Sequence, residues 1–360
     1  MSKKEQVLRK MMESITPADE NARCAAHERW ASCAKPLGGL GLLETMIEDM
    51  AALTGTADVH LEKRTLLVLC ADNGVVAEGV SQTGSEVTAV VARQLGAGQS
   101  TACRMAAIAD CKVVAVDMGI LNPPPLPGVL NARVANGTGN IARGPAMTRE
   151  QAAEVVWNGM ELVRLQKKAG VQMLAAGEMG IGNTTTATAV TCALLGLDPA
   201  DVTGRGAGLS DAGLQRKIQA IRQALAVNAP DAADPLDVLC KVGGLDIAGL
   251  CGLFLGGALY GVPVLMDGVI TAAAALCAAK LCPASDKAIF PSHCSAEPCG
   301  KRLLDALHKK PLITAGLHLG EGTGALAAIP LLDMALAVYS GSTFADYGMQ
   351  AYTPQGGSSC

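Results

Sequence analysis

The stretch VQMLAAGEMGIGNTTTAT, residues 171–188, decides the fold: a continuously apolar run leads into a glycine-rich turn and then into a helix-like run. A short apolar run ending in glycines is typical of a strand buried in a parallel sheet. The turn that follows favours an anion, because the first N–H groups of a helix have no partner inside it. It carries Glu178 and lacks the Gly-Lys-Ser/Thr of a nucleotide P-loop. We therefore expect a sugar phosphate; a turn serving only tight helix–sheet packing is the alternative.

Similar apolar runs recur along the chain, each ending in a Gly- or Asp-rich turn. They are TLLVLCADNG (65–74), KVVAVDMG (112–119), VPVLMDG (262–268), KAIFPSHCSAE (287–297) and PLITAGLHLGEGTG (311–324). Helix-like segments lie between most of them, which predicts an α/β fold, a Rossmann-like parallel sheet with helices on both faces. Ligands of such sheets bind beyond the carboxyl ends of the strands, where we expect Asp72, Asp117, Glu178, Asp267, Ser295 and Glu321 to collect. For Asp72 and Asp117, helix capping or turn formation is the simpler alternative.

Both chain ends look helical and lie outside this alternation. We expect residues 1–60 with 340–360 to form a small helical domain beside a catalytic sheet domain of residues 61–339. A chain of 360 residues is long enough for one large α/β domain with such an appendage.

The composition narrows the class of function. A net charge of −4 and only 2% aromatic residues disfavour a nucleic-acid partner. The 13 cysteines are scattered without Cys-x-x-Cys pairs, which indicates reduced core thiols rather than zinc or disulfides, and a cytoplasmic location. Residues 247–266 are uncharged and long enough to span a bilayer. Their glycines and Pro263 instead indicate a buried helix followed by a strand, and no membrane association.

A second glycine-rich turn lies in HLGEGTGALAA, residues 318–328. Glycines 320, 322 and 324 surround Glu321, and a carboxylate whose pKa is set by burial can act as a general base. The pattern also resembles a dinucleotide fingerprint, but too little chain follows for the usual downstream βαβ unit.

Two further motifs suit phosphate binding. In GRGAGLSDAGLQRKIQAIRQAL (204–225), Ser210 or Asp211 can cap a helix that carries Lys217 on the flank of its apolar face. Lys217 could reach a phosphate, or it could be an ordinary surface lysine. In PSHCSAEPCG (291–300), Ser295 suits a second phosphate loop, whereas adjacent His293 and Cys294 rarely make an activated nucleophile.

Together, GEMGIGNTTTA, GRGAGLSDAGLQRK, SHCSAE and HLGEGTGA resemble the nicotinate-nucleotide–dimethylbenzimidazole phosphoribosyltransferases. KPLGGLGLLE and GPAMTREQA match further signatures, so the resemblance spans nearly the whole chain. It implies a sheet domain with a small helical domain, a dimer, and no metal or redox cofactor. It also implies transfer of phosphoribose from nicotinate mononucleotide to a lower-ligand base of cobamides, with inversion from β to α.

The resemblance implies a role for each matching residue. Glu321 is the catalytic base and Glu178 contacts the ribose. Asp246 and Asp267 match acidic positions around the pocket. The contacts to phosphate and ribose are Gly180, Ile181, Gly182, Asn183, Thr184, Gly206, Lys217 and Ser295.

One segment departs from the family. Residues 79–91 read GVSQTGSEVTAVV where many relatives read close to GVSAYPxEVTAQM. The resemblance implies that Thr83 and Val91 line the acceptor pocket with Met179, so we expect dimethylbenzimidazole, a purine or a phenol as acceptor. The alternatives are a weakly active or non-catalytic paralogous subunit of a heteromeric enzyme, against which the presence of both Glu178 and Glu321 argues, and a nicotinamide-dependent oxidoreductase.

Overall fold

The structure, a computed structural model, describes residues 2–352. A parallel sheet with strand order β3-β2-β1-β4-β5-β6 runs through its centre. The strands are β1 (Arg64–Ala71), β2 (Lys112–Gly119), β3 (Leu130–Asn131), β4 (Met173–Met179), β5 (Val264–Met266) and β6 (Ile289–Pro291). The predicted α/β class is confirmed. The chain winds outward from β1 to β2 and β3 and then from β4 to β6, so the strand order reverses between β1 and β4.

Five of the apolar runs form strands, but the run at 311–324 does not. Its one sheet-like contact is the bridge between Ile313 and His293. Pro311 lacks a donor, and the glycines that follow favour irregular backbone over a strand. Conversely, β3 was not expected, because its two residues are exposed and carry no apolar pattern.

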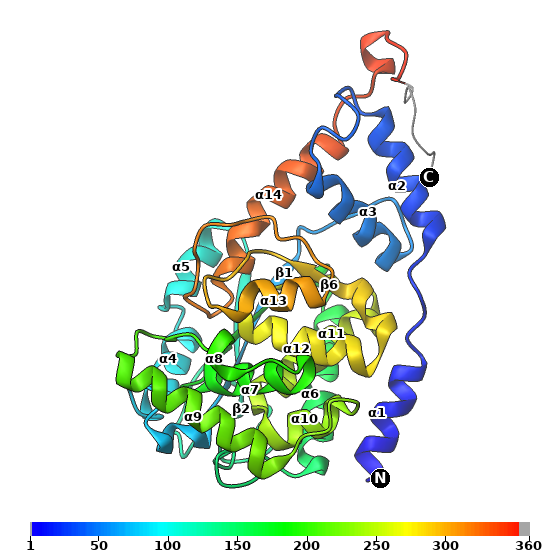
Figure 1. The fold of residues 1–360 in the computed structure, drawn as a ribbon. Coiled ribbons are helices and arrows are strands. Elements are labelled where there is room, and N and C mark those ends of the chain that lie inside the picture. Colours follow the sequence, from blue (N-terminus) through cyan, green and yellow to red (C-terminus); the bar gives the residue numbers. More distant parts are fainter. Residues whose placement is uncertain (1, 353–360) are drawn as a thin grey trace.

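Helices cover both faces of the sheet (Figure 1). On one face α11 contacts β1, β2, β4 and β5 and packs against α6 and α12; α4, α5 and α14 contact the sheet from the other side. The helices are α1 (Lys3–Glu13), α2 (Glu20–Ser32), α3 (Leu42–Thr54), α4 (Glu86–Gly96), α5 (Thr101–Ile108), α6 (Arg149–Lys168), α7 (Asn183–Leu195), α8 (Pro199–Val202), α9 (Asp211–Asn228), α10 (Pro235–Val242), α11 (Leu245–Tyr260), α12 (Val269–Leu281), α13 (Cys299–Ala306) and α14 (Thr323–Tyr339). Short 3₁₀ turns are η1 (Gly74–Glu78), η2 (Pro283–Ala288) and η3 (Ala345–Tyr347).

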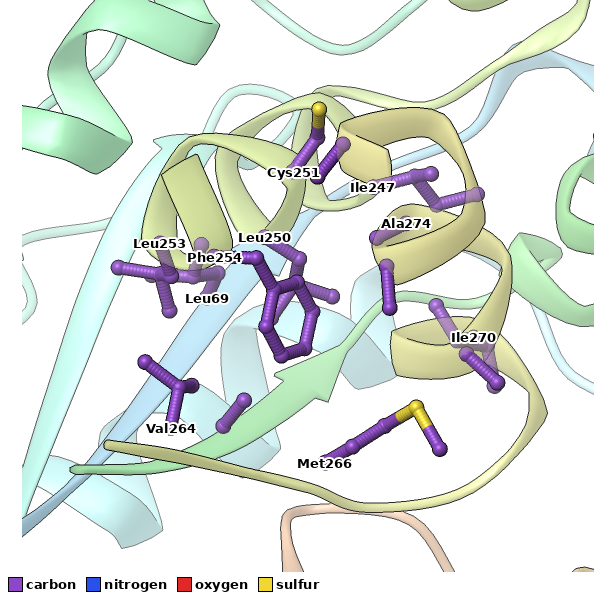
Figure 2. Close-up of a cluster of buried hydrophobic side chains, with 14 of the residues drawn as sticks. Leu69, Ile247, Leu250, Cys251, Leu253, Phe254, Val264, Met266, Ile270 and Ala274 are labelled. Atoms are coloured by element: carbon purple, nitrogen blue, oxygen red, sulfur yellow. The ribbon is translucent and has the colours of Figure 1, made fainter. Parts of the chain in front are cut away.

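The core between α11, α12 and the sheet is shown in Figure 2. Phe254 and Leu250 of α11 lie with Leu69 of β1 and Val264 of β5, all without exposed surface. Each such side chain contributes about 1.5–3 kcal/mol on burial. The uncharged stretch 247–266 is therefore a buried helix followed by a strand, as predicted. Among residues 2–352, no helix combines the length and apolarity needed to cross a membrane; the cytoplasmic location stays a prediction.

The two chain ends meet around α2 and α3. Cys33 pairs with Thr343 in an antiparallel bridge, and the rings of Trp30 and Tyr339 lie 4.7 Å apart. In Figure 1 this group stands at one end of α14, away from α1. Helix α1 packs against α6 and α11 instead. The domain division at residues 60 and 340 stays a prediction, and residues 353–360 of it lie outside the described chain.

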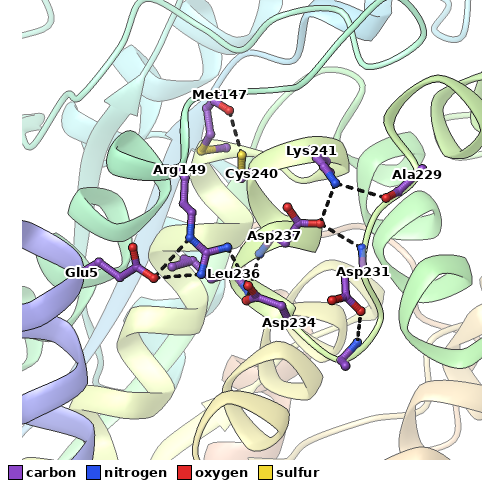
Figure 3. Close-up of polar contacts among 11 residues, drawn as sticks. Glu5, Met147, Arg149, Ala229, Asp231, Asp234, Leu236, Asp237, Cys240 and Lys241 are labelled. Atoms are coloured by element: carbon purple, nitrogen blue, oxygen red, sulfur yellow. Dashed lines mark hydrogen bonds and ion pairs between the residues drawn. The ribbon is translucent and has the colours of Figure 1, made fainter. Parts of the chain in front are cut away.

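Helix α1 is anchored to the sheet domain by an ion-pair cluster (Figure 3). The Arg149 guanidinium donates to Glu5 (Nη2–Oε1 2.9 Å) and to Asp234 (Nη1–Oδ2 2.6 Å). Arg149 lowers the pKa of Glu5. All three side chains are partly solvated, so the cluster fixes the position of α1 more than it adds stability.

Most described cysteines are packing residues. Eleven of them are free thiols. Burial raises the pKa of Cys111 and Cys277 to about 12, which keeps these thiols protonated and unreactive. The expectation of reduced thiols is wrong for Cys24, which is disulfide-bonded.

Candidate active site

A cavity of about 250 Å³ opens at the carboxyl ends of β4, β5 and β6. The β4–α7 turn, the residues after β5 and β6, and the segment before α14 form most of its wall. The loop after β1 closes one side through Val80, Ser81 and Gln82. Of the predicted residues, the cavity brings together Glu178, Met179, Gly180, Ile181, Gly182, Asn183, Thr184, Gly206, Asp267, Ser295 and Glu321.

The β4–α7 turn presents an open helix terminus to this cavity. Gly182 is the N-cap of α7, with φ of 90° and no side-chain hydrogen bond. The Asn183 side chain does not cap the helix but points to carboxylates. Within residues 2–352 nothing accepts a hydrogen bond from the Thr184 N–H. A free amide at the positive end of a helix suits a phosphate oxygen.

Two buried carboxyl groups lie beneath this turn. Asn183 Nδ2 donates to Glu178 Oε2 and, over 2.9 Å, to Asp246 Oδ2. Burial, together with the charge of Asp246, raises the pKa of Glu178 to about 8. Burial also raises the pKa of Asp246 to about 6. Glu178 therefore holds a proton at neutral pH and can both donate to and accept from a ribose hydroxyl.

Lys217 lies behind the same turn and is fully buried. Its Nζ donates to Thr184 Oγ1 over 2.8 Å and to the Gly204 carbonyl over 3.1 Å. Burial lowers the pKa of Lys217 to about 8. The surface-lysine alternative is wrong: α9 carries Lys217 inward, where its positive charge faces the residues around the open amide of α7.

Glu321 reaches the cavity from an irregular turn rather than from a strand end. Its φ of 57° is in the left-handed region, and its carboxylate Oε2 lies 3.4 Å from the Ala102 backbone nitrogen. The turn rests directly on β4: a Cβ on Gly177 would lie 2.9 Å from the Glu321 carbonyl carbon. Glycine at 177 thus permits the close approach that places Glu321 beside Glu178. The Glu321 side chain is half-buried.

Asp267 holds this turn in place. Its carboxylate accepts from the N–H groups of Gly322 (3.1 Å), Gly324 (2.7 Å) and Ala325 (3.3 Å) at the start of α14. The N-terminus of α14 is therefore occupied by a carboxylate of the protein itself. This carboxylate follows β5 and lies 54 positions before Glu321 in the sequence. Burial raises the pKa of Asp267, and nearby His293 counteracts this.

Several predicted residues lie outside the cavity. Asp72 accepts from Thr88 and the Leu121 N–H, and Asp117 pairs with Arg133, so both shape loops as the simpler alternative had it. Asp246 lies below the cavity floor, as described above. Thr83 is exposed next to Gln82, whereas Val91 packs against the core; neither belongs to the cavity wall.

The further lining residues, which the sequence patterns did not single out, include Gln82, Arg205, Glu297 and His318. Each lies within a motif quoted above, but only the folded arrangement selects it. Among residues 2–352, no group of three or more His, Cys, Asp or Glu side chains is arranged to hold a metal ion.

Comparison with known proteins gives one consistent result. A family model described as "Phosphoribosyltransferase" matches residues 15–349. The nicotinate-nucleotide–dimethylbenzimidazole phosphoribosyltransferase of Acetivibrio thermocellus is 44% identical over 91% of this chain and 93% of its own length. The protein of the same name from Escherichia coli O127:H6 is 40% identical over 93% and 94%.

Solved structures agree with this result. The crystal structure of CobT from Thermus thermophilus superimposes with a TM-score of 0.87, at 41% identity, over 92% of this chain and 99% of that one. A second structure from the same organism, described as the same phosphoribosyltransferase, gives 0.86 at 40% identity, with the same coverage of 92% and 99%.

Proposed function

The chain belongs to the nicotinate-nucleotide–dimethylbenzimidazole phosphoribosyltransferase family, and on that premise we propose how its cavity carries out the reaction. It is a phosphoribosyltransferase of cobamide biosynthesis. The substrates are nicotinate mononucleotide, which donates the phosphoribosyl group, and a lower-ligand base, which accepts it. This membership decides against the nicotinamide-dependent oxidoreductase.

The donor nucleotide occupies the side of the cavity formed by the β4–α7 turn. Its phosphate accepts from the Thr184 amide and is neutralised by Lys217, with Gly206 and Ser295 as further contacts. Its ribose hydroxyls bind the Glu178 carboxyl group, which carries both a donor and an acceptor when protonated. Gly180, Ile181, Gly182 and Asn183 complete this wall, with Asp246 beneath it.

The chemistry requires one base. The pyridinium leaving group is already cationic, so the bond from C1′ to the pyridine nitrogen breaks with its electron pair going to nicotinate, and no acid is needed. The acceptor nitrogen or oxygen attacks C1′ from the opposite face, which inverts β to α. The acceptor loses a proton, from the other ring nitrogen of an azole or from the hydroxyl of a phenol, and the Glu321 carboxylate in the same cavity takes it up.

The observation that carries this proposal is the convergence of two distant turns. Glu178 and Glu321 line the same cavity although 143 positions separate them (321 − 178). The test is incubation with nicotinate mononucleotide and dimethylbenzimidazole, following nicotinate release and the anomeric configuration by NMR. We expect release that depends on the base and an α-ribotide product. Base-independent release to ribose phosphate, or a β product, would contradict the mechanism.

The acceptor side is formed by Met179 and the loop after β1; Thr83 follows the lining residue Gln82 in that loop, and Val91 lies on α4 outside the cavity wall. Because this loop departs from the family at residues 83 and 91, we propose that dimethylbenzimidazole is not the sole good acceptor. Competition among dimethylbenzimidazole, adenine and p-cresol at equal concentration tests this. An exclusive preference for dimethylbenzimidazole would refute it.

The assembly we propose is a dimer of two copies, or of this chain with a paralogue. Met334 and Val338 expose an apolar strip on α14, which supports a partner there. The purified chain should sediment as a dimer and turn over by itself. A monomer active only after a paralogue is added would support the heteromeric alternative.

A further inference from the structure

A second carboxylate stands beside the proposed phosphate site. Glu297 follows β6, lines the cavity and is half-buried. Its Oε1 accepts from the Gly206 N–H over 3.1 Å, and its own N–H donates to Ser295 Oγ over 3.3 Å. It therefore connects two segments that contact the phosphate in the proposed function.

The segment 204–206 is built around this carboxylate. A Cβ on Gly204 would lie 1.7 Å from Glu297 Oε2, so any other residue at 204 would require the carboxylate to move from this position. The carbonyl of the same Gly204 accepts from Lys217 Nζ over 3.1 Å. One short loop thus contacts the carboxylate through Gly204 and Gly206 and contacts the ammonium through the Gly204 carbonyl.

Lys217 has few charged neighbours. The Glu297 carboxylate favours its charged form, as does the thiol of Cys299 at the start of α13. Burial raises the pKa of Cys299 to about 11, so that thiol is neutral near pH 7 and contributes little. From α7 the lysine faces the neutral hydroxyl of Thr184, and the nearby Arg205 guanidinium is engaged with the Leu209 carbonyl and Asp211. Glu297 is therefore the carboxylate that partly offsets the burial of Lys217, whose pKa still lies below its ordinary value.

We propose that Glu297 is a positioning residue of the phosphate site: it fixes the 204–206 loop and serves as the counter-ion that keeps buried Lys217 charged before the nucleotide binds. Without it, burial would favour neutral lysine, which attracts phosphate far less. The inference rests on the proposed function, because it requires the phosphate of nicotinate mononucleotide to bind at Lys217.

The role of Glu297 predicts how the affinity for the nucleotide depends on pH. The pKa of Lys217 is about 8, so its charge is present below that pH and is lost as the pH rises through it. Glu297→Gln keeps an oxygen for the Gly206 N–H but removes the charge, so the pKa of Lys217 falls further. The affinity for nicotinate mononucleotide should then be lost at lower pH than in the wild type.

The experiment measures KM and kcat for nicotinate mononucleotide at pH 6.5, 7.5 and 8.5 with saturating base. We expect the KM of Glu297→Gln to be roughly fivefold above the wild type at the higher pH and within about twofold at pH 6.5. The kcat should stay within about twofold throughout. Glu297→Asp, which keeps the charge, should restore most of the affinity, and the exposed Glu150→Gln on α6 is the matched control.

Lys217→Met distinguishes a failure of the proposed phosphate site from a failure of the role of Glu297. It should raise the KM about tenfold or more at pH 7.5, since it removes a charged hydrogen-bond donor. An unchanged KM in Lys217→Met would contradict the phosphate site itself. A raised KM in Lys217→Met with wild-type behaviour of Glu297→Gln at every pH would overturn the role of Glu297 alone. A lower KM in Glu297→Gln would also overturn it, since Glu297 would then compete with the phosphate.

Discussion

The two glycine turns that meet in the cavity look alike in sequence but differ at the helices that follow them. The N-terminus of α7 has no side-chain cap, and the Thr184 N–H has no partner in the described chain. The N-terminus of α14 is filled, because Asp267 accepts from three of its N–H groups. Only the first has a free N–H group for the phosphate that we propose it binds.

A glycine turn before a helix is therefore a phosphate site only if the protein supplies no anion of its own. At α7 the nearby carboxyl groups, Glu178 and Asp246, bind Asn183 and stay off the helix terminus. At α14 the internal carboxylate turns the helix terminus into a support for Glu321. This difference supports the proposed roles, binding for the first turn and proton transfer for the second.

The most severe test of this division is Glu321→Gln. The amide cannot take the proton of the attacking base, so kcat should fall by about a hundredfold to ten-thousandfold. Binding of nicotinate mononucleotide, measured by calorimetry, should persist because the donor side is untouched. Glu150→Gln is the control for a remote loss of charge. Turnover close to that of the wild type would remove Glu321 from its role.

Asp267→Ala tests whether the filled helix terminus positions Glu321. Losing its three accepted hydrogen bonds should lower the free energy of unfolding by about 1–3 kcal/mol. The kcat should fall by about tenfold to a hundredfold as the turn shifts, with a much smaller change in the KM for the nucleotide. Asp198→Ala, which removes the cap of the short helix α8, is the matched control.

A double variant distinguishes positioning from stability alone. If Asp267 acts through Glu321, adding Asp267→Ala to Glu321→Gln should reduce kcat little further, because the residue it positions is already inactive. Multiplicative losses would show that the two residues act independently and would contradict the proposed division of roles.

Much of this arrangement could be predicted from sequence, and the two turns show why some could not. The apolar run before Glu178 predicts β4 because local pattern and fold agree there. The run before Glu321 is equally suggestive, yet it forms no strand, since Pro311 and the glycines after it weaken pairing. Lys217 could not be placed from sequence either. Its position on the flank of α9 is compatible with exposure or burial, and only the packing of the folded chain turns it inward. The carboxylate of Asp267 is far from α14 in sequence, so no local signal reveals its contact.

The buried carboxyl group of Glu178 should also make the stability of the fold depend on pH. The pKa of Glu178 is about 8 in the folded chain against 4.5 as the ordinary value, so the native state keeps a proton that the unfolded state has released. Stability should therefore fall as the pH rises from 4.5 to 8, with a slope of up to about 1.4 kcal/mol per pH unit from this residue.

Glu178→Gln removes that slope. Urea unfolding at pH 6.5, 7.25 and 8 isolates it, because Asp246, with a pKa of about 6, has largely titrated by then. We expect the free energy of unfolding of Glu178→Gln to change less with pH than that of the wild type. The exposed Glu150→Gln should keep the wild-type slope. Equal slopes in Glu178→Gln and the wild type would mean that the folded protein already holds Glu178 ionised.

The smallest expected effect concerns the acceptor side. If the α7 turn holds the nucleotide, a change on this side should alter the choice of base and leave nucleotide binding unchanged. Thr83→Tyr restores the ring that many relatives carry, on the exposed residue that follows the lining residue Gln82. An added ring supplies only a few contacts to the base. The kcat/KM for dimethylbenzimidazole, divided by the kcat/KM for adenine, should therefore rise by about twofold to fivefold. The KM for nicotinate mononucleotide should not change, since its phosphate and ribose are held by the α7 turn, and Thr83→Ala should leave both quantities alone. An altered nucleotide KM with an unaltered acceptor ratio would place the donor on the wrong side of the cavity and reverse the roles of the two turns.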